Sequence, residues 1–177
     1  MGFAGRFKTA DTRDSLSQLI EPTIAALADE QMTVIVAAGR SDLEAISLPQ
    51  GHTPDNTKIE NFIPFEFILP KVDVFVTNGG FGAVNLALSK GVAMVAAGDT
   101  EDKVFTAGRV SWTGTGINLG TGRPSSEQIR AAVHVVLGDR RYKDNAARLQ
   151  REFPRYNAFD LITKTVQSLL CNDYGSL

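Results

Sequence analysis

Short runs of apolar and often β-branched residues alternate along this chain with segments that have helical spacing. The clearest runs are residues 33–38 (TVIVAA), 73–77 (DVFVT) and 93–97 (AMVAA). Runs this short and this uniformly apolar are typical of parallel strands that are buried on both faces of a sheet. Their alternation with helices predicts an α/β domain with a doubly wound parallel sheet, in which ligands bind beyond the carboxyl ends of the strands.

The segments between and after these runs complete the predicted order of elements. The first helix is expected over residues 15–29, with Asp14 or Ser15 capping its start, and short strands are expected at residues 58–63 and 117–119. The capping pattern at Ser125 opens one of the later helices. These helices are expected at residues 64–70, 83–90, 103 to about 110, 125–137, 139–153 and 157–170.

The start of the chain departs from this alternation. A doubly wound domain normally opens with a buried strand, but residues 1–14 hold only scattered apolar residues among Gly, Lys, Arg and Asp. We therefore expect the first strand to be missing or degraded. On this interpretation residues 1–14 are an irregular segment and residues 15–177 form a single domain.

Composition excludes several classes of protein. The chain has 177 residues, 43% of them hydrophobic and 21% charged, and a formal net charge of -2, which is ordinary for one globular domain and gives no electrostatic attraction to nucleic acid. The single cysteine, Cys171, excludes an internal disulfide and a cysteine metal cluster, and we expect no metal site. No apolar stretch approaches ~18 residues, so neither a membrane span nor a signal peptide is predicted and the cytoplasm is the expected location.

A glycine-rich loop, residues 77–83 (TNGGFGA), lies between a β-branched strand and a helix. Unpaired backbone N–H groups and the helix dipole make such a junction a binding site for anions such as a diphosphate. The alternative is a hairpin turn at Asn78-Gly79, but Val84, Ala87, Leu88 and Gly91 follow with helical spacing. A nicotinamide-binding fingerprint fits poorly, since its third glycine is replaced and the loop is not in the first βα unit, and the P-loop pattern is absent.

Several separated motifs, in order, resemble the carboxyl-terminal domain of the family 1 glycosyltransferases, which use UDP- or TDP-sugars. The similarity extends over residues 15–170 and is greatest to microbial natural-product and macrolide-type enzymes. The motifs are Phe62-Ile63-Pro64-Phe65, Ile68-Leu69-Pro70, Asp73 to Gly80 (DVFVTNGG), Ala87 to Val92 (ALSKGV) and Glu101-Asp102-Lys103. The resemblance implies the Rossmann-like carboxyl-terminal half of the two-domain GT-B architecture, with residues 15–177 as its nucleotide-sugar-binding domain.

The resemblance also implies roles for particular residues. Phe62 and Ile63 would lie beside the uracil or thymine base, and Glu101, Asp102 and Lys103 would meet the hydroxyls of the donor sugar. The diphosphate would be held by Asn78, Gly79, Gly80, Phe81, Gly82 and Ala83. Taken from the residues alone, Phe62 also suits the core, Glu101 and Asp102 suit a solvated helix cap, and Asn78 suits a turn.

Three positions depart from the family pattern. The phosphate-binding histidine of many members is Asn78 here, which can donate a hydrogen bond but carries no charge. The ribose-binding glutamate aligns at or near Leu86, so the neighbouring Asn85 is the candidate substitute. The usual proline before the next strand is Ala93.

The resemblance places the acceptor pocket and the catalytic base in an amino-terminal domain outside these residues. We therefore expect a donor-binding domain that holds a UDP- or TDP-sugar for hexosyl transfer to a small-molecule acceptor, has no catalytic residue or cofactor of its own, and is inactive alone. The expected partner is a separate amino-terminal domain, and we also expect the chain to self-associate. The alternatives are a non-catalytic nucleotide-sugar binder or regulatory subunit, a truncated gene product, and a nucleotide-sugar epimerase of similar architecture.

Overall fold

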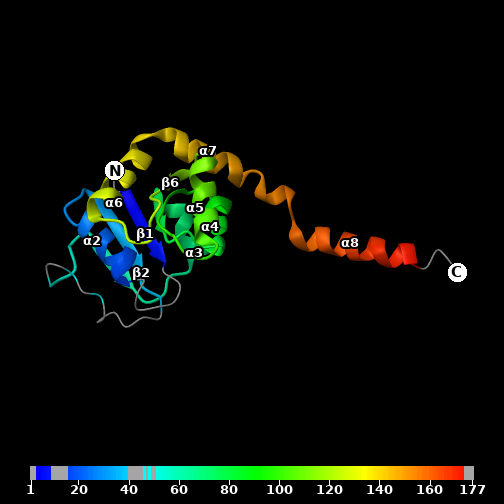
Figure 1. Ribbon diagram of the computed structural model, residues 1–177, viewed down its shortest axis with the longest axis horizontal. Coiled ribbons are helices and arrows are strands. Elements are labelled where there is room, and N and C mark those ends of the chain that lie inside the picture. The colour runs from blue at the N-terminus through cyan, green and yellow to red at the C-terminus, as the bar shows by residue number, and fades with distance from the viewer. Residues whose placement is uncertain (1–2, 9–15, 40–45, 47, 49–50, 174–177) are drawn as a thin grey trace.

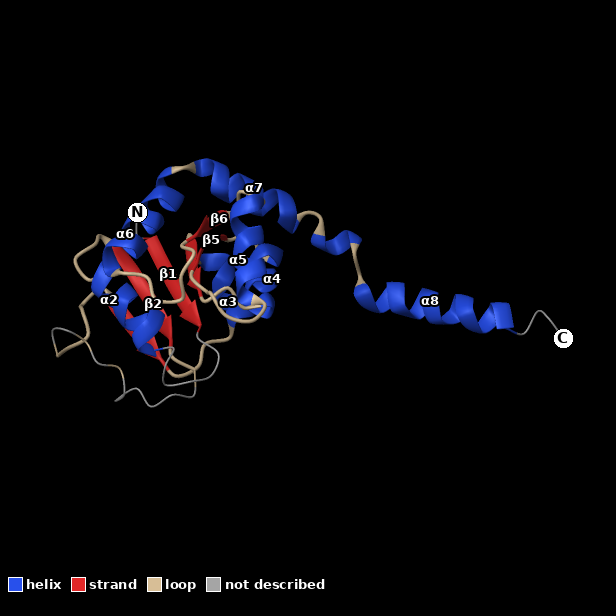
Figure 2. Cartoon of the chain, in the orientation of Figure 1, coloured by secondary structure: helices blue, strands red, loops and turns tan. Residues whose placement is uncertain are grey.

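The structure is a computed structural model that describes residues 3–8, 16–39, 46, 48 and 51–173. Its centre is a parallel sheet with the strand order β3-β2-β1-β4-β5-β6 (Figure 2). This is the order of the classic doubly wound fold, and it reverses direction between β1 and β4. The strands are β1 (Phe3–Lys8), β2 (Met32–Ala37), β3 (Thr57–Glu60), β4 (Val74–Thr77), β5 (Ala93–Ala96) and β6 (Gly116–Asn118).

The expectation that the first strand is missing is wrong. β1 lies in the middle of the sheet, pairs with β2 in parallel along all six of its residues, from Phe3 beside Met32 to Lys8 beside Ala37, and pairs with β4 on its other side. Its sequence, FAGRFK, contains a glycine and two basic residues, so it lacks the uniform apolar run by which the other central strands were predicted. Backbone pairing with two neighbouring strands holds it in the sheet despite this composition.

The helices connect these strands and follow the predicted order. Residues 64–70, predicted as one helix, divide into an α-helical turn after Pro64 and a 3₁₀ turn containing Pro70. The predicted first helix begins with a π-helical turn, and the caps predicted for it, Asp14 and Ser15, lie outside the described residues. The helical elements are η1 (Leu16–Ile20), α2 (Glu21–Leu27), α3 (Phe65–Ile68), η3 (Leu69–Lys71), α4 (Phe81–Ser89), α5 (Lys103–Trp112), α6 (Ser126–Gly138), α7 (Arg140–Gln150), η4 (Phe153–Arg155) and α8 (Ala158–Asp173).

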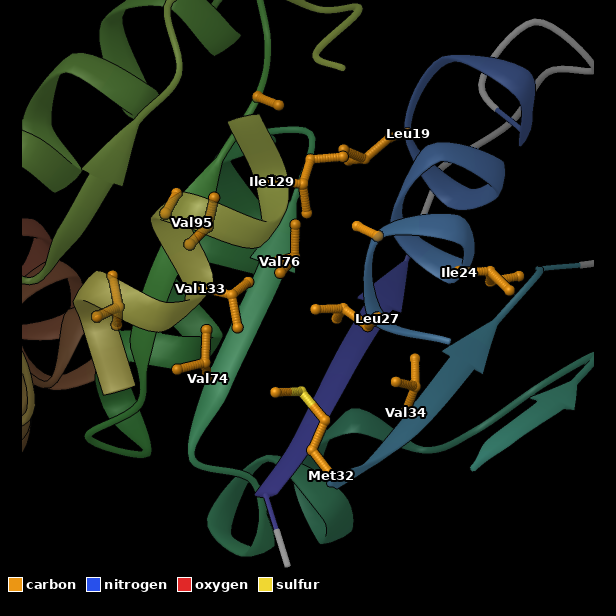
Figure 3. Packing of buried hydrophobic residues seen from close by; sticks show 14 of the residues in the cluster. Leu19, Ile24, Leu27, Met32, Val34, Val74, Val76, Val95, Ile129 and Val133 are labelled. Carbon is orange, nitrogen blue, oxygen red and sulfur yellow. The ribbon is translucent and has the colours of Figure 1, made fainter. Parts of the chain in front are cut away.

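Two hydrophobic clusters cover the two faces of the sheet. On one face α2 and α6 pack on β2, β4 and β5, and side chains such as Leu27, Val34 and Ile129 belong to the same buried cluster (Figure 3). On the other face α3, α4 and α5 pack around Phe75, which is fully buried and meets Phe65 edge-on with ring centroids 5.6 Å apart. Burial on both faces explains why β2, β4 and β5 are almost wholly apolar.

Side chains cap the starts of two later helices, and the cap at Ser125 is the one that the sequence predicts. Ser125 accepts a hydrogen bond from the backbone N–H of Gln128, and the Gln128 side chain accepts one from the N–H of Ser125, which completes the predicted capping box. That hydroxyl also holds the pKa of Glu127 below its usual range. At the start of α7 the side chain of Asp139 caps the N–H of Arg141, and the Arg141 guanidinium lowers the pKa of that carboxyl.

The last helix, α8, extends away from the body of the domain (Figure 1). Residues 158–170 of this helix are all exposed, although one face of it is apolar. The exposed apolar side chains are Phe159, Leu161, Ile162, Val166, Leu169 and Leu170. A helix with this pattern is amphipathic and gains most of its stability from a partner surface.

Candidate functional site

The glycine-rich loop lies at the carboxyl edge of the sheet, between the end of β4 and the start of α4. Because β4 is one of the two strands at which the strand order reverses, this is the crevice where doubly wound folds bind their ligands. Strand, loop and helix follow one another as predicted, and the hairpin alternative for Asn78-Gly79 is wrong. The site therefore has the geometry expected for a bound phosphate.

Side-chain oxygens hold the loop in a tight turn. The N–H of Gly79 donates to Thr77 Oγ1 and that of Gly80 donates to Asn78 Oδ1, both at 3.3 Å. Gly79 has a φ of 79°, a left-handed conformation that favours glycine. Asn78 thus acts as a turn residue, as one interpretation of the sequence expected. Its Nδ2 has no partner among the described residues, so the same side chain can still donate to a ligand.

The first turn of α4 presents backbone donors to the crevice. The N–H of Val84 donates to the carbonyl of Gly80 at 3.0 Å, so the N–H groups of Phe81, Gly82 and Ala83 precede the hydrogen-bonded part of the helix. Gly80 is the N-cap and provides no side-chain cap, and a Cβ built on Gly82 would meet no atom within 4 Å. An anion can therefore approach these donors closely at the positive end of the helix dipole.

A second loop, residues 97–102, packs directly against the glycine-rich loop. A Cβ added to Gly98 would overlap the backbone carbonyl of Asn78 and would lie 2.9 Å from Lys103 Cβ. A Cβ on Gly79 would lie 3.4 Å from both Ala107 Cβ and the Lys103 carbonyl oxygen. The two loops thus touch through glycines. Sequence reasoning missed Gly98, although a glycine that directly follows a strand at the carboxyl edge was a usable signal.

The acidic pair predicted to meet the donor sugar lies on this second loop. Glu101 has a φ of 55°, the one positive value for a non-glycine residue in the described chain, and its side chain is 76% exposed. Asp102 occupies the N-cap position of α5 and is exposed, but its carboxylate makes no cap hydrogen bond. The helix-cap interpretation therefore describes the position of Asp102 and not the bonding of its side chain. Backbone strain of this kind is concentrated at functional sites.

Lys103 is engaged within the same loop. Its Nζ lies 3.3 Å from Glu101 Oε2 and donates to Thr100 Oγ1 at 3.3 Å. These contacts hold the ammonium group beside the acidic pair and half-bury the side chain. The structure therefore favours Lys103 as a residue that positions Glu101, and a direct bond to a sugar would compete with these two contacts.

The residues predicted to contact the base lie on the connection between β3 and α3, which runs along the same carboxyl edge of the sheet. The ring of Phe62 is 78% exposed and Ile63 is half-buried. The alternative role of Phe62 in the core is therefore wrong. Its exposed ring offers a surface on which a planar base can stack.

An open cavity of about 840 Å³ lies between α4 and α5. Asn85, the candidate for ribose binding, lies on its wall and donates from Nδ2 to the carbonyl of Phe81 at 2.9 Å, which leaves its Oδ1 as an acceptor. The sequence did not predict this cavity. Its lining residues at the end nearest the two loops are Phe81, Asn85, Asp102 and Phe105.

Other site types find no support in the described part of the chain. No group of three His, Cys, Asp or Glu residues there could hold a metal ion. His134 Nε2 lies 3.1 Å from Glu30 Oε1, away from the glycine-rich loop. Among the residues that the structure describes, no helix combines the length and apolarity needed to cross a bilayer.

Comparisons with known proteins identify the family of this chain. Residues 21–158 match the model of the erythromycin biosynthesis protein CIII-like, C-terminal domain. The chain is 39% identical over 151 residues to UDP-glycosyltransferase 2 of Phaeomoniella chlamydospora, covering 85% of this chain and 33% of that protein. It is 43% identical over 141 residues to 4'-demethylrebeccamycin synthase of Lentzea aerocolonigenes, covering 80% and 32%. This chain therefore spans about a third of the length of these curated relatives.

A solved structure gives the same fold. Spinosyn rhamnosyltransferase SpnG complexed with thymidine diphosphate superposes with a TM-score of 0.77 at 19% identity, covering 87% of this chain and 42% of that one. The likeness shows that the domain has the Rossmann-like α/β fold found in part of this GT-B glycosyltransferase. The family match over residues 21–158 shows that this chain belongs to the erythromycin biosynthesis protein CIII-like C-terminal domain family of family 1 glycosyltransferases.

Proposed function

We propose that this chain is the donor-binding domain of a glycosyltransferase that transfers a hexosyl group from a UDP- or TDP-sugar to a small-molecule acceptor and releases UDP or TDP. The observation that carries the proposal is the first turn of α4, where the N–H groups of Phe81, Gly82 and Ala83 precede the hydrogen-bonded part of the helix and Gly80 offers no side chain to cap them. The relatives named for UDP and the SpnG complex named for thymidine diphosphate support a nucleoside diphosphate as the anion.

The chemistry that this site can supply is stabilisation of a leaving group. In a direct displacement the acceptor hydroxyl attacks the anomeric carbon, a base takes its proton, and the C–O bond to the diphosphate breaks. The diphosphate gains negative charge as it leaves, and the backbone donors and helix dipole at Gly80–Ala83 would stabilise that charge. Glu101 and Asp102 would accept hydrogen bonds from the sugar hydroxyls, since carboxylates suit a ligand rich in O–H donors. Phe62 and Asn85 would complete the nucleoside contacts.

Titration calorimetry tests the proposal directly. We expect UDP or TDP, and at least one of their sugars, to bind at a single site. The proposal would be contradicted if neither UDP, TDP, a UDP-sugar nor a TDP-sugar bound the folded chain. Binding without any transfer, even in the presence of an amino-terminal domain from a relative, would favour a non-catalytic nucleotide-sugar binder.

A double substitution separates sugar recognition from nucleotide recognition. Replacing Glu101 and Asp102 together with alanine should weaken binding of a nucleotide-sugar about threefold to tenfold and leave the bare diphosphate nearly unchanged, because only the sugar contacts these exposed carboxylates. The matched control is Asp144→Ala with Glu152→Ala, which removes the same charge from positions in and just after α7. If the nucleotide-sugar and the bare diphosphate lost affinity equally, the acidic loop would act only through its electrostatic field and not by contact with the sugar.

The purified chain is expected to bind donor without transferring sugar. The base and the acceptor pocket are proposed to reside in a further domain, since this chain spans about a third of its curated relatives. The measurement is an assay of sugar transfer to a panel of phenolic and sterol acceptors, in which mass spectrometry detects the glycosylated product. Turnover that is abolished by Gly80→Val would show that a base does exist within these residues.

A further inference from the structure

A third loop adjoins the candidate site. Residues 119–125 connect β6 to α6, and because β4, β5 and β6 pair in parallel, this loop lies at the same carboxyl edge as the glycine-rich loop and the acidic loop (residues 97–102). The acidic loop follows β5, which lies between the other two strands. It therefore has a neighbouring loop on either side, and it meets the glycine-rich loop through Gly98.

The acidic loop packs against residues 119–125 through a second glycine. A Cβ added to Gly122 would overlap Asp99 Oδ1, and it would lie 2.9 Å from Cγ and 3.1 Å from Oδ2 of the same side chain. The three nearest atoms thus all belong to the Asp99 carboxylate, which lies directly over the bare Cα of Gly122. Any side chain at position 122 would have to displace this carboxylate.

The loop that contains Gly122 is itself held in a defined conformation. Asn118 Oδ1 and Thr121 Oγ1 each accept a hydrogen bond from the backbone N–H two residues further along, at 2.9 and 3.1 Å. Pro124 is buried, and α6 begins directly after it with its capping box. Residues 119–125 therefore present a fixed surface to the acidic loop.

The backbone of Glu101 needs support of this kind. Its left-handed conformation is unfavourable for a residue with a Cβ, and it persists only where the surrounding structure restrains it. On the carboxyl side the restraint comes from Lys103, whose Nζ contacts Glu101 and Thr100 and whose N–H donates to the Thr100 carbonyl at 3.1 Å. On the amino side the packing of Asp99 on Gly122 provides the corresponding restraint.

We propose that Asp99 is a positioning residue for the donor-sugar site and that Gly122 holds it in place. Together they fix the amino-terminal end of the acidic loop, and so determine where Glu101 and Asp102 meet the sugar. Residues 119–125 thereby influence sugar recognition without touching the donor. This inference rests on the proposed function, in which the two carboxylates accept hydrogen bonds from the sugar hydroxyls.

A cycle of three variants tests whether Gly122 acts through Asp99. Asp99→Ala and Gly122→Ala should each weaken binding of a nucleotide-sugar about threefold to tenfold and leave the bare diphosphate nearly unchanged, as measured by calorimetry. Asp99 is exposed, so its truncation should not prevent folding. The double variant should bind as Asp99→Ala does, because the three atoms nearest to an added Cβ are then absent. Additive losses would overturn the proposal.

Two further comparisons complete the binding experiment. Gly138→Ala is the matched control, since a Cβ there meets no atom within 4 Å, and it should change neither affinity. In a chain that already has Glu101→Ala and Asp102→Ala, Asp99→Ala should cause no further loss of nucleotide-sugar affinity, because the carboxylates that it positions are gone. A further loss would show that Asp99 binds the sugar directly and would overturn the positioning role.

Amide hydrogen exchange tests the acidic loop without any ligand. The N–H of Lys103 closes this loop onto Thr100, so exchange at that amide should be at least threefold faster in Gly122→Ala than in Gly138→Ala, with the amides of β4 as the reference for global unfolding. Unchanged exchange would overturn the inference and leave the proposed function intact. If exchange rose as expected but the wild-type chain bound neither UDP, TDP nor their sugars, the proposed function would fail, and with it the role in sugar recognition.

Discussion

Replacing Gly80 with valine should weaken binding of UDP or TDP at least tenfold, about 1.4 kcal/mol. Gly80 has a φ of -60° and a ψ of 138°, which valine adopts readily, and an added Cβ would lie no closer than 3.5 Å to another residue, at Asn78 Oδ1. The variant should therefore fold. Its branched side chain would occupy the space in front of the α4 donors, where the diphosphate is proposed to lie. Calorimetry with the bare diphosphates measures the effect.

Gly138→Val provides the control for this variant. Gly138 ends α6 and an added Cβ there would also meet no atom within 4 Å, so the substitution adds the same side chain away from the glycine-rich loop. It should leave the affinity for UDP and TDP unchanged. If a folded Gly80→Val chain bound both diphosphates as tightly as the wild type, the glycine-rich loop would not be the site.

Replacing Phe75 with alanine should lower the free energy of unfolding by about 3–5 kcal/mol. Phe75 is fully buried in β4, and its loss would leave a cavity beneath α3, α4 and α5 and remove the edge-on contact with Phe65. Urea unfolding followed by circular dichroism gives the change in free energy. Because β4 leads directly into the glycine-rich loop, the remaining folded protein should also bind donor more weakly.

Phe67→Ala is the matched control for the core substitution. Phe67 lies in α3 and is 72% exposed, so the same truncation should change the free energy of unfolding by about 0.5 kcal/mol or less. Similar losses for Phe67→Ala and Phe75→Ala would show that the second hydrophobic cluster is not packed as described.

The parts of the fold that were predicted from sequence are those whose burial leaves a local pattern. β2, β4 and β5 are buried on both faces, so each is an apolar run whose predicted limits differ from the structure by one residue. β1 has the central place in the sheet but no such run. Its position depends on pairing with β2 and β4, which are far from it in sequence. The composition of residues 3–8 alone therefore does not predict that pairing.

The candidate site shows the same division. A strand, a glycine-rich loop and a helix are contiguous, so the strand-loop-helix junction of residues 77–83 could be predicted from the residues alone. The contact between Gly98 and Asn78 could not be predicted, because it joins two loops that are far apart in the sequence. The left-handed backbone of Glu101 could not be predicted either, because glutamate rarely adopts this conformation. The exposure of Phe62 likewise depends on what the fold leaves uncovered, since aromatic residues of the same type fill the core at Phe65 and Phe75.

The contact between Gly98 and Asn78 limits how the glycine-rich loop and the acidic loop can change. Since no side chain fits between them, any larger residue at position 98 would have to move the backbone of the glycine-rich loop as well as the acidic loop. A protein engineer who grafts residues 99–102 from a relative with another donor preference should therefore retain Gly98 and Lys103 on either side of the graft. Under the proposed function, a graft that keeps both residues would exchange the sugar contacts and leave the nucleotide contacts in place, whereas a graft that replaces Gly98 would disturb the glycine-rich loop as well.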